Sequence, residues 1–598
     1  MTATNTLEMA LNREQLKIAL RLNENILVNG GPGSGKTTLL VYRIFHQLNA
    51  TKNSNSKMLC LTFTNEAAKE LKSRLWEILS PDSRERLWIG TFHQFGNYLL
   101  QHYSHLLGIS RESEIIDQEG TTDILRNILL EINKNSNLGR LNDLPRIISR
   151  FRGKVNVPDP SELVGISETI GRIMVRYREM KRELRLLDFD DLIELPLNLI
   201  KKNPNLKKLL RDTFRFIFID ELQDTSLLQL ELLREIMDLG SCKIFAVADQ
   251  NQLLYEWRDA RSETISEFIK NFNASEEFLT LNHRSPQNFV NALNTLINKD
   301  SKRLDREFKS TIKDQRGDLF YHKALDPEDE ANFVTKDIIS EINLQGKKYG
   351  DFVILFRMFE SMKEIKESLT NSQIPFCVIG DKSLQDSLLA KIIKNSISVI
   401  ADHPHSKSNL INSLTKFLKE QGANFSEPEV RLQSLESLRN EPISEIFSNI
   451  IKKLGIDTII PKAKLQTHLL IIQKIINIAI SEGAKNAGNL STLLNVEWGR
   501  LQNKAQESDK AIRIMTIHQS KGLEFPVVYI MRLEDGILPK KMKGEIRNLE
   551  EERRLLFVAL SRAKSKIVMS YSEVNEKGYR TQPSRFFEEM NGVDIKKI

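Results

Sequence analysis

A glycine-rich segment near the N-terminus has the residue types and spacing of a phosphate-binding loop. Residues 30–37 read Gly-Gly-Pro-Gly-Ser-Gly-Lys-Thr, which is glycine, four residues, then glycine, lysine and threonine. The glycines let backbone N–H groups converge on phosphate oxygens, Lys36 supplies a cation for the outer phosphates, and the Thr37 hydroxyl is a ligand for Mg²⁺. An apolar stretch, 25–29, precedes the loop and a helix-like stretch begins at Thr37. The segment therefore predicts a nucleoside triphosphate site.

Two consecutive carboxylates further along the chain are suited to complete that chemistry. Asp220 and Glu221 directly follow the apolar run Phe216–Ile219. A carboxylate at the end of a buried parallel strand lies at the carboxyl edge of the sheet, where ligands bind in α/β folds. We expect Asp220 to hold Mg²⁺ and Glu221 to orient or deprotonate the attacking water.

Short apolar runs, separated by helix-like stretches, have to position these residues. The predicted strands are 25–29, 57–63, 88–92, 215–219 and 242–247 in the first half, and 351–357, 375–379, 512–517, 526–530 and 566–570 in the second. Uninterrupted apolar strands that alternate with helices are typical of parallel sheets covered on both faces. The expected fold is therefore α/β, with two parallel-sheet domains.

Two long stretches show helical periodicity and no clear strand, so each sheet domain is expected to contain a helical insertion. The first sheet domain would comprise 1–110 and 186–276, with its insertion at 111–185. The second would comprise 277–385 and 508–598, with its insertion at 386–507.

Length and composition agree with this division and exclude several other classes of protein. The chain has 598 residues, 40% of them hydrophobic and 28% charged, which indicates a globular protein of about three to five domains. No run approaches the length of a membrane span, and the N-terminus lacks the pattern of a secretion signal. The three cysteines are scattered, which favours a reducing, cytoplasmic setting over a disulfide framework. The net charge of +7 permits a nucleic-acid partner without requiring one.

Further short motifs occur in a fixed order along nearly the whole chain. They are Asn12–Gln15, Thr62–Ala68, Gly90–His93, Asp188–Leu192, Asp220–Asp224, Asp249–Arg258, Leu281–Ser285, Thr516–Phe525, Glu534–Pro539 and Glu551–Ala563. No single one is decisive, but the ordered set is specific, and it resembles the superfamily 1 helicases of the UvrD/Rep/PcrA type. The resemblance implies that both sheet domains are RecA-like.

The resemblance assigns further residues to the ATP site. Gln252 would sense the γ-phosphate, while Arg284 and Arg562, from the second sheet domain, would act as arginine fingers on the transition-state charge. Gln15 would read the adenine. The implied nucleotide-binding set is Gln15, Gly31, Gly33, Ser34, Gly35, Lys36, Thr37, Thr38, His283 and Glu524. ATP would bridge the two domains, so that binding closes the cleft and hydrolysis releases it.

The resemblance also implies a DNA track across the carboxyl edges of both sheets. In the family, the residues at the positions of Phe63, Tyr255 and Trp257 stack on bases or line up with them. Stacking suits single strands because every base has a π-face. The positions similar to the family's backbone- or base-contacting residues are His93, Arg258, Arg357 and His518.

The sequence departs from the family pattern in several places. Ala248, Leu253 and Asp259 replace the usual Gly, Ser and Gly of the third motif, and Ser561 replaces Thr in the sixth. His283 stands where a Tyr usually stacks on adenine, so weaker stacking is expected there. None of these changes removes a phosphate or metal ligand.

The implied function is an ATP- and Mg²⁺-dependent motor that moves 3′ to 5′ on single-stranded DNA and separates duplex at single-strand/double-strand junctions. One alternative is the translocating motor subunit of a repair or phage-defence assembly, which unwinds little alone and works with a protein partner such as a nuclease. The second insertion is shorter than is usual in the family, which favours this alternative. Two further alternatives are a nucleotide-gated DNA-binding module with negligible turnover and a motor that moves on RNA. Glu221, Arg284 and Arg562 argue against the module.

Overall fold

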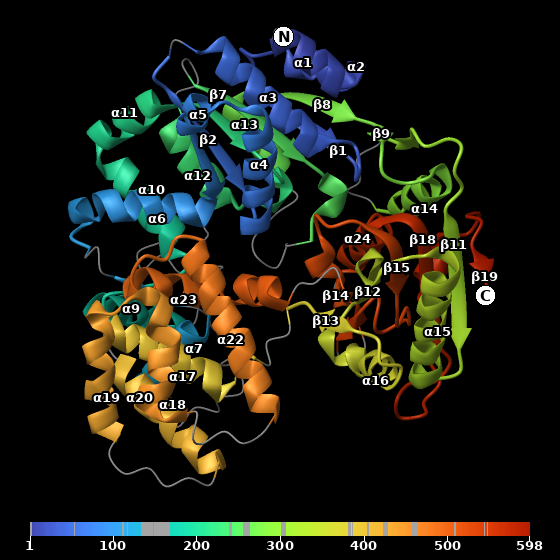
Figure 1. Cartoon of the computed structure of the whole chain (residues 1–598). Helices are drawn as coiled ribbons and strands as arrows, with labels where there is room; N and C mark the ends of the chain where they lie inside the picture. Colours follow the sequence, from blue (N-terminus) through green and yellow to red (C-terminus); the bar gives the residue numbers. More distant parts are fainter. Residues whose placement is uncertain are drawn as a thin grey trace.

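The structure is a computed structural model, and it contains two parallel β-sheets and two groups of helices (Figure 1). It describes residues 3–52, 54–109, 113–116, 118–132, 148, 168–237, 242–254, 263–300, 306–380, 384–385, 387–403, 406–421, 428–456, 463–506, 510–542, 545–546 and 548–598. The first sheet lies near the N-terminus and the second near the C-terminus, and most of the helical insertions form a third body below the first sheet (Figure 1).

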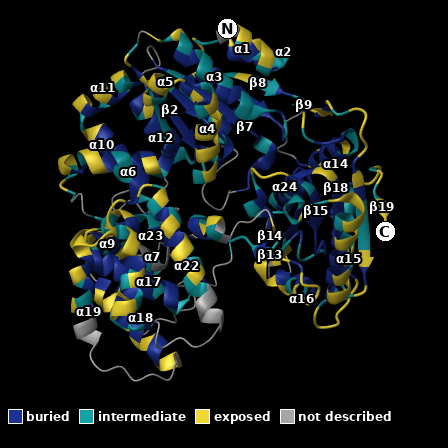
Figure 2. Cartoon of the chain, viewed as in Figure 1, coloured by how far each residue is buried: buried dark blue, intermediate teal, exposed yellow. Residues whose placement is uncertain are grey.

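The first sheet is entirely parallel, in the order β3-β2-β6-β7-β1-β8. Its strands are β1 (Ile26–Gly30), β2 (Lys57–Thr62), β3 (Leu87–Thr91), β6 (Phe214–Ile219), β7 (Lys243–Ala248) and β8 (Ser275–Leu279). Every residue of β1 is buried, because helices cover both faces of the sheet. Figure 2 shows the same contrast in both sheet domains, with buried strands inside and exposed residues on the outer faces of the helices.

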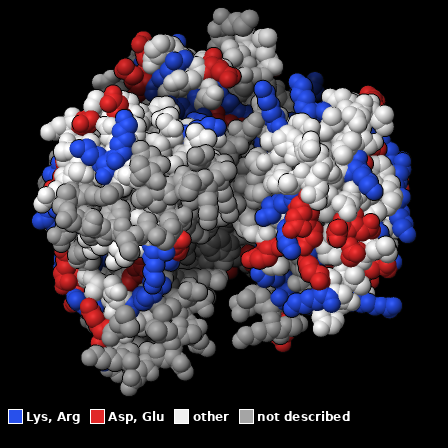
Figure 3. Space-filling model, turned by 60° about the horizontal axis from the view of Figure 1, so that its bottom comes forward, with Lys and Arg blue, Asp and Glu red and all other residues white. Residues whose placement is uncertain are grey.

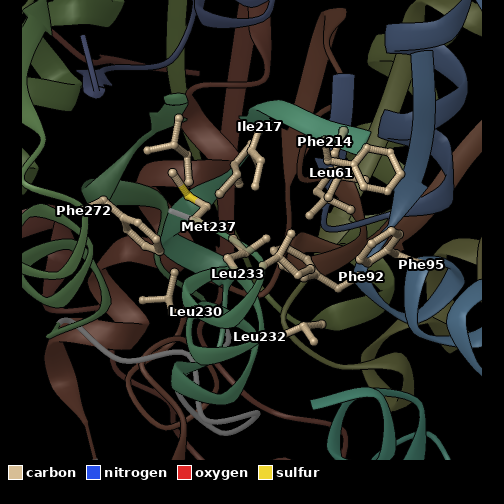
Figure 4. Packing of buried hydrophobic residues seen from close by; sticks show 14 of the residues in the cluster. Leu61, Phe92, Phe95, Phe214, Ile217, Leu230, Leu232, Leu233, Met237 and Phe272 are labelled. Atoms are coloured by element: carbon tan, nitrogen blue, oxygen red, sulfur yellow. The ribbon is translucent and has the colours of Figure 1, made fainter. Parts of the chain in front are cut away.

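Separate hydrophobic cores form on the two faces of this sheet. One face packs against α1 (Ala3–Ala10), α2 (Arg13–Ala19), α3 (Lys36–Ala50) and α4 (Asn65–Ile78). The other packs against α6 (Phe92–Tyr103), α10 (Asp191–Lys202), α11 (Pro204–Thr213), α12 (Leu227–Ile236) and α13 (Glu263–Phe272). In this second core Phe92 lies between Leu233 and Phe95, beneath Leu61 and Ile217 of the sheet (Figure 4).

The second sheet is also entirely parallel, in the order β13-β14-β12-β15-β18-β11-β19. Its strands are β11 (Asp318–Ala324), β12 (Phe352–Phe356), β13 (Phe376–Val378), β14 (Ile512–Thr516), β15 (Phe525–Ile530), β18 (Ala563–Ser572) and β19 (Lys596–Lys597). One face packs against α14 (Gln287–Ile297), α24 (Leu549–Leu560) and α25 (Phe586–Glu589), and the other against α15 (Pro327–Gln345) and α16 (Lys363–Asn371).

These two sheets confirm the predicted fold class, two RecA-like parallel-sheet domains. All the predicted strands are present, each beginning and ending within three residues of its predicted limits. The prediction omitted three strands of the two sheets, which are β8, β11 and β19. In β8, an edge strand of sequence Ser-Glu-Glu-Phe-Leu, only Leu279 is fully buried, so the apolar run that marks a central strand is missing.

Helices occupy the described parts of both expected insertions. The first contains α7 (Gln118–Ile132) and α9 (Glu168–Glu183), and residues 149–167 of this expected insertion lie outside the described residues. The second contains α17 (Leu388–Ile400), α18 (Ser406–Gln421), α19 (Pro428–Glu436), α20 (Ile446–Leu454), α22 (Ala463–Ser481) and α23 (Ala487–Gln506). No helix among the described residues is long and apolar enough to cross a membrane. The domain limits themselves stay a prediction.

The second insertion contacts the first sheet domain and the first insertion. Glu482, at the end of α22, accepts a bond from Lys69 of α4 at 2.5 Å, and it also binds Arg500. Asn495 of α23 donates to Glu114 at 3.2 Å, in the short strand β4 (Glu114–Ile115) that begins the first insertion. A segment inserted in the second sheet domain is therefore held against the first domain.

Candidate nucleotide and DNA site

The phosphate loop joins the buried strand β1 to the 15-residue helix α3. Gly33 and Gly35 both have positive φ, 70° and 76°. A Cβ at Gly33 would lie 2.7 Å from Cβ of Arg284, and one at Gly35 would lie 2.5 Å from Nε2 of Gln15. Both positions therefore require glycine, for backbone conformation and for space. The loop leads into the N-terminus of α3, where free amides and the helix dipole favour an anion.

Lys36 points back into the loop that it follows. Its Nζ donates to the carbonyl oxygens of Gly30 at 2.8 Å and Gly31 at 3.0 Å, and lies 3.5 Å from Oδ2 of Asp249. Asp249, which follows β7, is fully buried. It was not among the predicted site residues, although a carboxylate directly after a buried parallel strand is the same signal that identified Asp220.

Asp220 and Glu221 lie at the carboxyl end of β6, as predicted. Burial, together with the negative charge of the neighbouring Glu221, raises the pKa of Asp220 to about 7 against the opposing effect of Lys36. Burial opposes ionisation of Glu221 as well, but Lys521 and Lys36 outweigh it, so the pKa of Glu221 lies below its usual value. Glu221 has a φ of 54°, a strained conformation for a residue with a side chain. Gln223 donates to its Oε2.

Side chains of the second sheet domain reach this buried cluster. Arg562, 1% exposed, donates from Nη2 to Oε1 of Gln252 at 3.0 Å, and Gln252 donates from Nε2 to Asp249 at 2.6 Å. Burial lowers the pKa of Arg562 to about 9, which still leaves it charged at neutral pH. A continuous polar path therefore runs from Lys36 through Asp249 and Gln252 to the other domain.

A second cross-domain contact was not predicted. Lys521 donates to Asp224 at 2.5 Å and to the carbonyl of Gln252 at 2.9 Å, and its Nζ lies 3.9 Å from Glu221. Asp224 is buried, and burial outweighs the attraction of Lys521 and raises the pKa of Asp224 to about 7. Both residues belong to motifs found in the sequence, but their pairing depends on how the two domains meet.

Arg284, in the second domain, lies next to the phosphate loop. It donates to Glu524 at 2.7 Å and to the carbonyl of Ser561 at 3.1 Å. Glu524 also pairs with Lys564 at 2.5 Å, so both of these predicted ATP-site residues are held by neighbours in their own domain.

The residues expected at the base and at the metal lie in the loop or next to it. Gln15 donates from Nε2 to the carbonyl of Ser34 at 3.0 Å, and the backbone N–H of His283 donates to the carbonyl of Gly33 at 2.8 Å. Thr37 and Thr38 form the first turn of α3, where Thr38 accepts a bond from an arginine of α4 at 3.5 Å.

The donor atoms around the loop fit a magnesium–phosphate complex. No described group of three or more His, Cys, Asp and Glu side chains forms a metal cluster. Mg²⁺ in triphosphate sites does not need one, because it takes one or two protein oxygens and completes its shell with phosphate and water. The Thr37 hydroxyl and the buried Asp220 carboxylate are oxygen donors of this kind. A bound cation would offset the energetic cost of burying the charged form of Asp220.

The predicted DNA-contacting residues are only partly described. Phe63 follows β2, His93 lies in the first turn of α6, and His518 lies in a short 3-10 helix after β14, so all three occupy carboxyl edges of the sheets. The ring of His93 meets Phe189 edge-on, with 5.9 Å between the centroids. Tyr255, Trp257 and Arg258, together with Asp259, lie outside the residues that the structure describes.

Arg357 has a protein partner instead of open space. Its guanidinium donates to both carboxylate oxygens of Glu552, at 2.9 and 2.6 Å, and Glu552 is 6% exposed. Among the described residues on the face drawn in Figure 3, basic and acidic side chains are interspersed and form no continuous basic band. A role of Arg357 in DNA binding therefore stays a prediction, and that role has to be compatible with the ion pair to Glu552.

Two RecA-like sheets, with the phosphate loop of one facing arginines of the other, define a two-domain motor of the phosphate-loop class. Comparison with protein families agrees: residues 11–273 match the UvrD/REP helicase N-terminal domain, and residues 278–427 and 461–574 match the UvrD-like helicase C-terminal domain. The chain belongs to the UvrD/Rep/PcrA family of superfamily 1 helicases and is an ATP-dependent DNA helicase.

Several curated relatives share almost the full length of the chain. Proteins named ATP-dependent DNA helicase PcrA from Leuconostoc citreum and Staphylococcus epidermidis are 26% and 27% identical. Each alignment covers 98% of this chain, with 85% of the first relative and 87% of the second. A protein of the same name from Staphylococcus aureus is 26% identical with the same coverage as the second.

Proposed function

We propose that this helicase uses ATP and Mg²⁺ to move 3′ to 5′ along single-stranded DNA and to separate duplex at the junction ahead. The observation that best supports the proposal is the polar path from Lys36 to Arg562, because it joins the phosphate loop to the second domain. If the γ-phosphate of ATP replaced these protein–protein bonds with bonds to itself, the contact between the two domains would change. Since ATP and chromosomal or plasmid DNA share one compartment, we infer a cytoplasmic location.

Hydrolysis would depend on residues from both domains. Thr37 and Asp220 would hold Mg²⁺, which supplies neutralising charge for the phosphates. Glu221 is ionised at neutral pH because its pKa is lowered, so it can orient the attacking water and accept its proton. Arg562 and Arg284 would stabilise charge on the transferring phosphoryl group, an effect of about 10³–10⁵ in rate in related enzymes.

The DNA strand would follow the carboxyl edges of the two sheets, where Phe63, His93 and His518 lie. The predicted contacts of Tyr255, Trp257, Arg258 and Arg357 belong to the same track. Aromatic stacking contributes about 1–3 kcal/mol per base without reading sequence, which suits a motor that must advance over any sequence.

A strand-displacement assay tests unwinding and polarity together. The expected result is ATP- and Mg²⁺-dependent separation of a duplex with a 3′ single-stranded overhang and much slower separation with a 5′ overhang. The Lys36→Ala variant, which lacks the phosphate-binding cation, is the control for contaminating activity. The opposite overhang preference would overturn the proposed polarity.

A translocation assay on single strands without duplex distinguishes the alternative function. Fast DNA-stimulated ATP hydrolysis and translocation, with no strand displacement, would replace our proposal by the motor-subunit function. In that case a partner such as a nuclease would be sought by copurification from the native cell.

A further inference from the structure

Residues 280–285 follow the last strand of the first sheet and run beside the phosphate loop. β8 pairs in parallel with β1, and the register places Leu279 next to Gly30, so both chains leave the sheet at the same edge. Just beyond this pair, Nδ2 of Asn282 donates to the carbonyl oxygen of Pro32 at 2.7 Å. The side chain of Asn282 is therefore bonded directly to the backbone of the loop.

The amide of Asn282 is shared between the phosphate loop and the turn that follows. The side chain is buried, and its Oδ1 accepts the backbone N–H of Arg284 at 2.9 Å and that of Ser285 at 2.8 Å. These partners settle which end of the amide is which, because an N–H can only donate and the carbonyl of Pro32 can only accept. Since one planar group makes all three bonds, the backbone of Arg284 cannot move relative to the loop without breaking one of them.

The turn packs closely against the loop. A Cβ at Gly33 would lie 2.7 Å from Cβ of Arg284 and 3.1 Å from Nδ2 of Asn282. The guanidinium of Arg284 binds Glu524 and the carbonyl of Ser561. On a backbone that is already fixed, the guanidinium needs only rotations of its own side chain to exchange these partners for a phosphate oxygen.

The end of the same turn is bonded to the second sheet. Ser285 is buried, and its Oγ donates to the carbonyl oxygen of Ala563 at 2.9 Å. Ala563 is the first residue of β18 and directly follows Arg562. Residues 280–285 are therefore hydrogen-bonded to the phosphate loop on one side and to the chain next to Arg562 on the other.

We propose that Asn282 is a positioning residue for ATP hydrolysis, which holds the backbone of Arg284 at a fixed place beside the phosphate loop. The inference deepens the proposed function and rests on Arg284 contacting the transferring phosphoryl group. A misplacement of about 1 Å can lower a rate about 10²-fold, so the support of the arginine matters as well as its presence. The effect of Asn282 on kcat is exerted through Arg284.

Asn282→Ser is the direct test, because serine keeps an oxygen that can accept a backbone N–H but is too short to reach Pro32. The kcat of DNA-stimulated ATP hydrolysis should fall about 10- to 100-fold, while the KM for ATP changes less than about 3-fold. Asn288→Ser is the matched control. Asn288, in α14, donates from Nδ2 to the carbonyl of Gly317 at 2.7 Å, a bond of the same kind within the second domain, and this variant should hydrolyse ATP normally.

A second substitution at the same position covers the case in which serine leaves a gap that loosens the fold. Asn282→Asp has the shape of asparagine and keeps both accepted bonds, but it offers Pro32 no donor. Its kcat at saturating ATP should fall as in Asn282→Ser, with the melting temperature close to wild type.

A double-mutant cycle tests whether the effect passes through Arg284. In the Arg284→Ala background, Asn282→Ser should lower kcat by less than about 3-fold, because no guanidinium is left to position. A purely structural role of Asn282 predicts the same loss with and without Arg284.

Three outcomes would overturn the inference. They are an unchanged kcat in both variants at position 282, a higher KM for ATP with an unchanged kcat, and equal losses in the two backgrounds of the cycle. Failure of the proposed function would look different, because Arg284→Ala alone would then hydrolyse ATP at the wild-type rate.

Discussion

Individual residues at the cleft owe their chemistry to burial and to partners that are distant in sequence. Asp220, Glu221 and Asp224 lie within five positions of one another, but only Glu221 has a lowered pKa. The difference arises because Lys521 and Lys36 act on Glu221 strongly enough to overcome its burial. The residue proposed as the base is thus kept ionised by a lysine of each domain.

Glu221→Gln should separate nucleotide binding from hydrolysis. The amide keeps the size of the side chain and can still accept the bond from Gln223, but it cannot take a proton from water. DNA-stimulated ATP hydrolysis should fall about 10²- to 10⁴-fold while binding of a fluorescent ATP analogue stays near wild type. Glu235→Gln, which alters a surface ion pair with Lys207, is the matched control and should hydrolyse ATP normally. Wild-type turnover in Glu221→Gln would show that the base is elsewhere.

At the scale of elements, buried polar side chains fix how helices pack on the sheets. Glu330 of α15 is fully buried, where its Oε1 accepts from the backbone N–H of Arg532 at 3.0 Å and from Ser570 at 2.5 Å. Burial raises the pKa of Glu330 to about 7, and the bonds to Arg532 and Ser570 only partly oppose this. Packing of α15 on the second sheet should therefore weaken when this carboxyl ionises.

The sign of the effect follows from the raised pKa. A carboxyl with a folded-state pKa near 7 and an unfolded value of 4.5 stabilises the fold fully below pH 4.5 and loses that contribution as pH rises through 7. Glu330→Gln does not titrate, so its melting temperature relative to wild type should increase from pH 5 to pH 8. The free-energy difference should reach at most about 3 kcal/mol.

Melting curves of Glu328→Gln provide the control for this pH series. Glu328 is exposed in the first turn of α15, so its variant should differ from wild type by a constant amount across the same range. A difference between Glu330→Gln and wild type that is flat or falls with pH would contradict the burial argument.

For the whole molecule, polar contacts join the second insertion to the first sheet domain. Glu482 binds Lys69 of the first sheet domain together with Arg500 and Lys504 of its own bundle, and these partners lower its pKa to about 2 despite partial burial. An ion pair as exposed as Lys69–Glu482 contributes little to the free energy of folding. We therefore expect it to favour one orientation of the second insertion without preventing others.

Cysteines introduced at positions 69 and 482 should report this arrangement. Lys69→Cys combined with Glu482→Cys should be joined by a short bismaleimide linker in the protein without DNA, as measured by a mobility shift on a denaturing gel. The natural cysteines Cys60, Cys242 and Cys377 are buried, and burial raises the pKa of the Cys60 thiol well above its usual value, so they should not compete.

A second pair controls for random encounter. Lys363 begins α16 of the second sheet domain, which Figure 1 draws apart from α22 and the helical body that contains Glu482, so Lys363→Cys with Glu482→Cys should not crosslink. Equal yields from the two pairs would mean that the insertion has no preferred contact with α4.

The sequence alone predicted what depends on neighbours along the chain. The central strands are continuous apolar runs, the phosphate loop is one segment, and Asp220 and Glu221 directly follow a strand, so local pattern was enough to find them. It failed at β8, because an edge strand is solvated along most of its length and lacks that pattern. Asp249 could have been found by the same rule as Asp220.

Tertiary structure decided which distant side chains meet. The bonds of Lys521 to Asp224 and of Arg562 to Gln252 join positions that lie 297 and 310 residues apart. Such pairings depend on how two separately formed sheets pack, and the types and order of the residues carry no signal for them. The local sequence determined which chemical groups each domain contributes, whereas the packing of the two domains determined the charge and the partners of those groups.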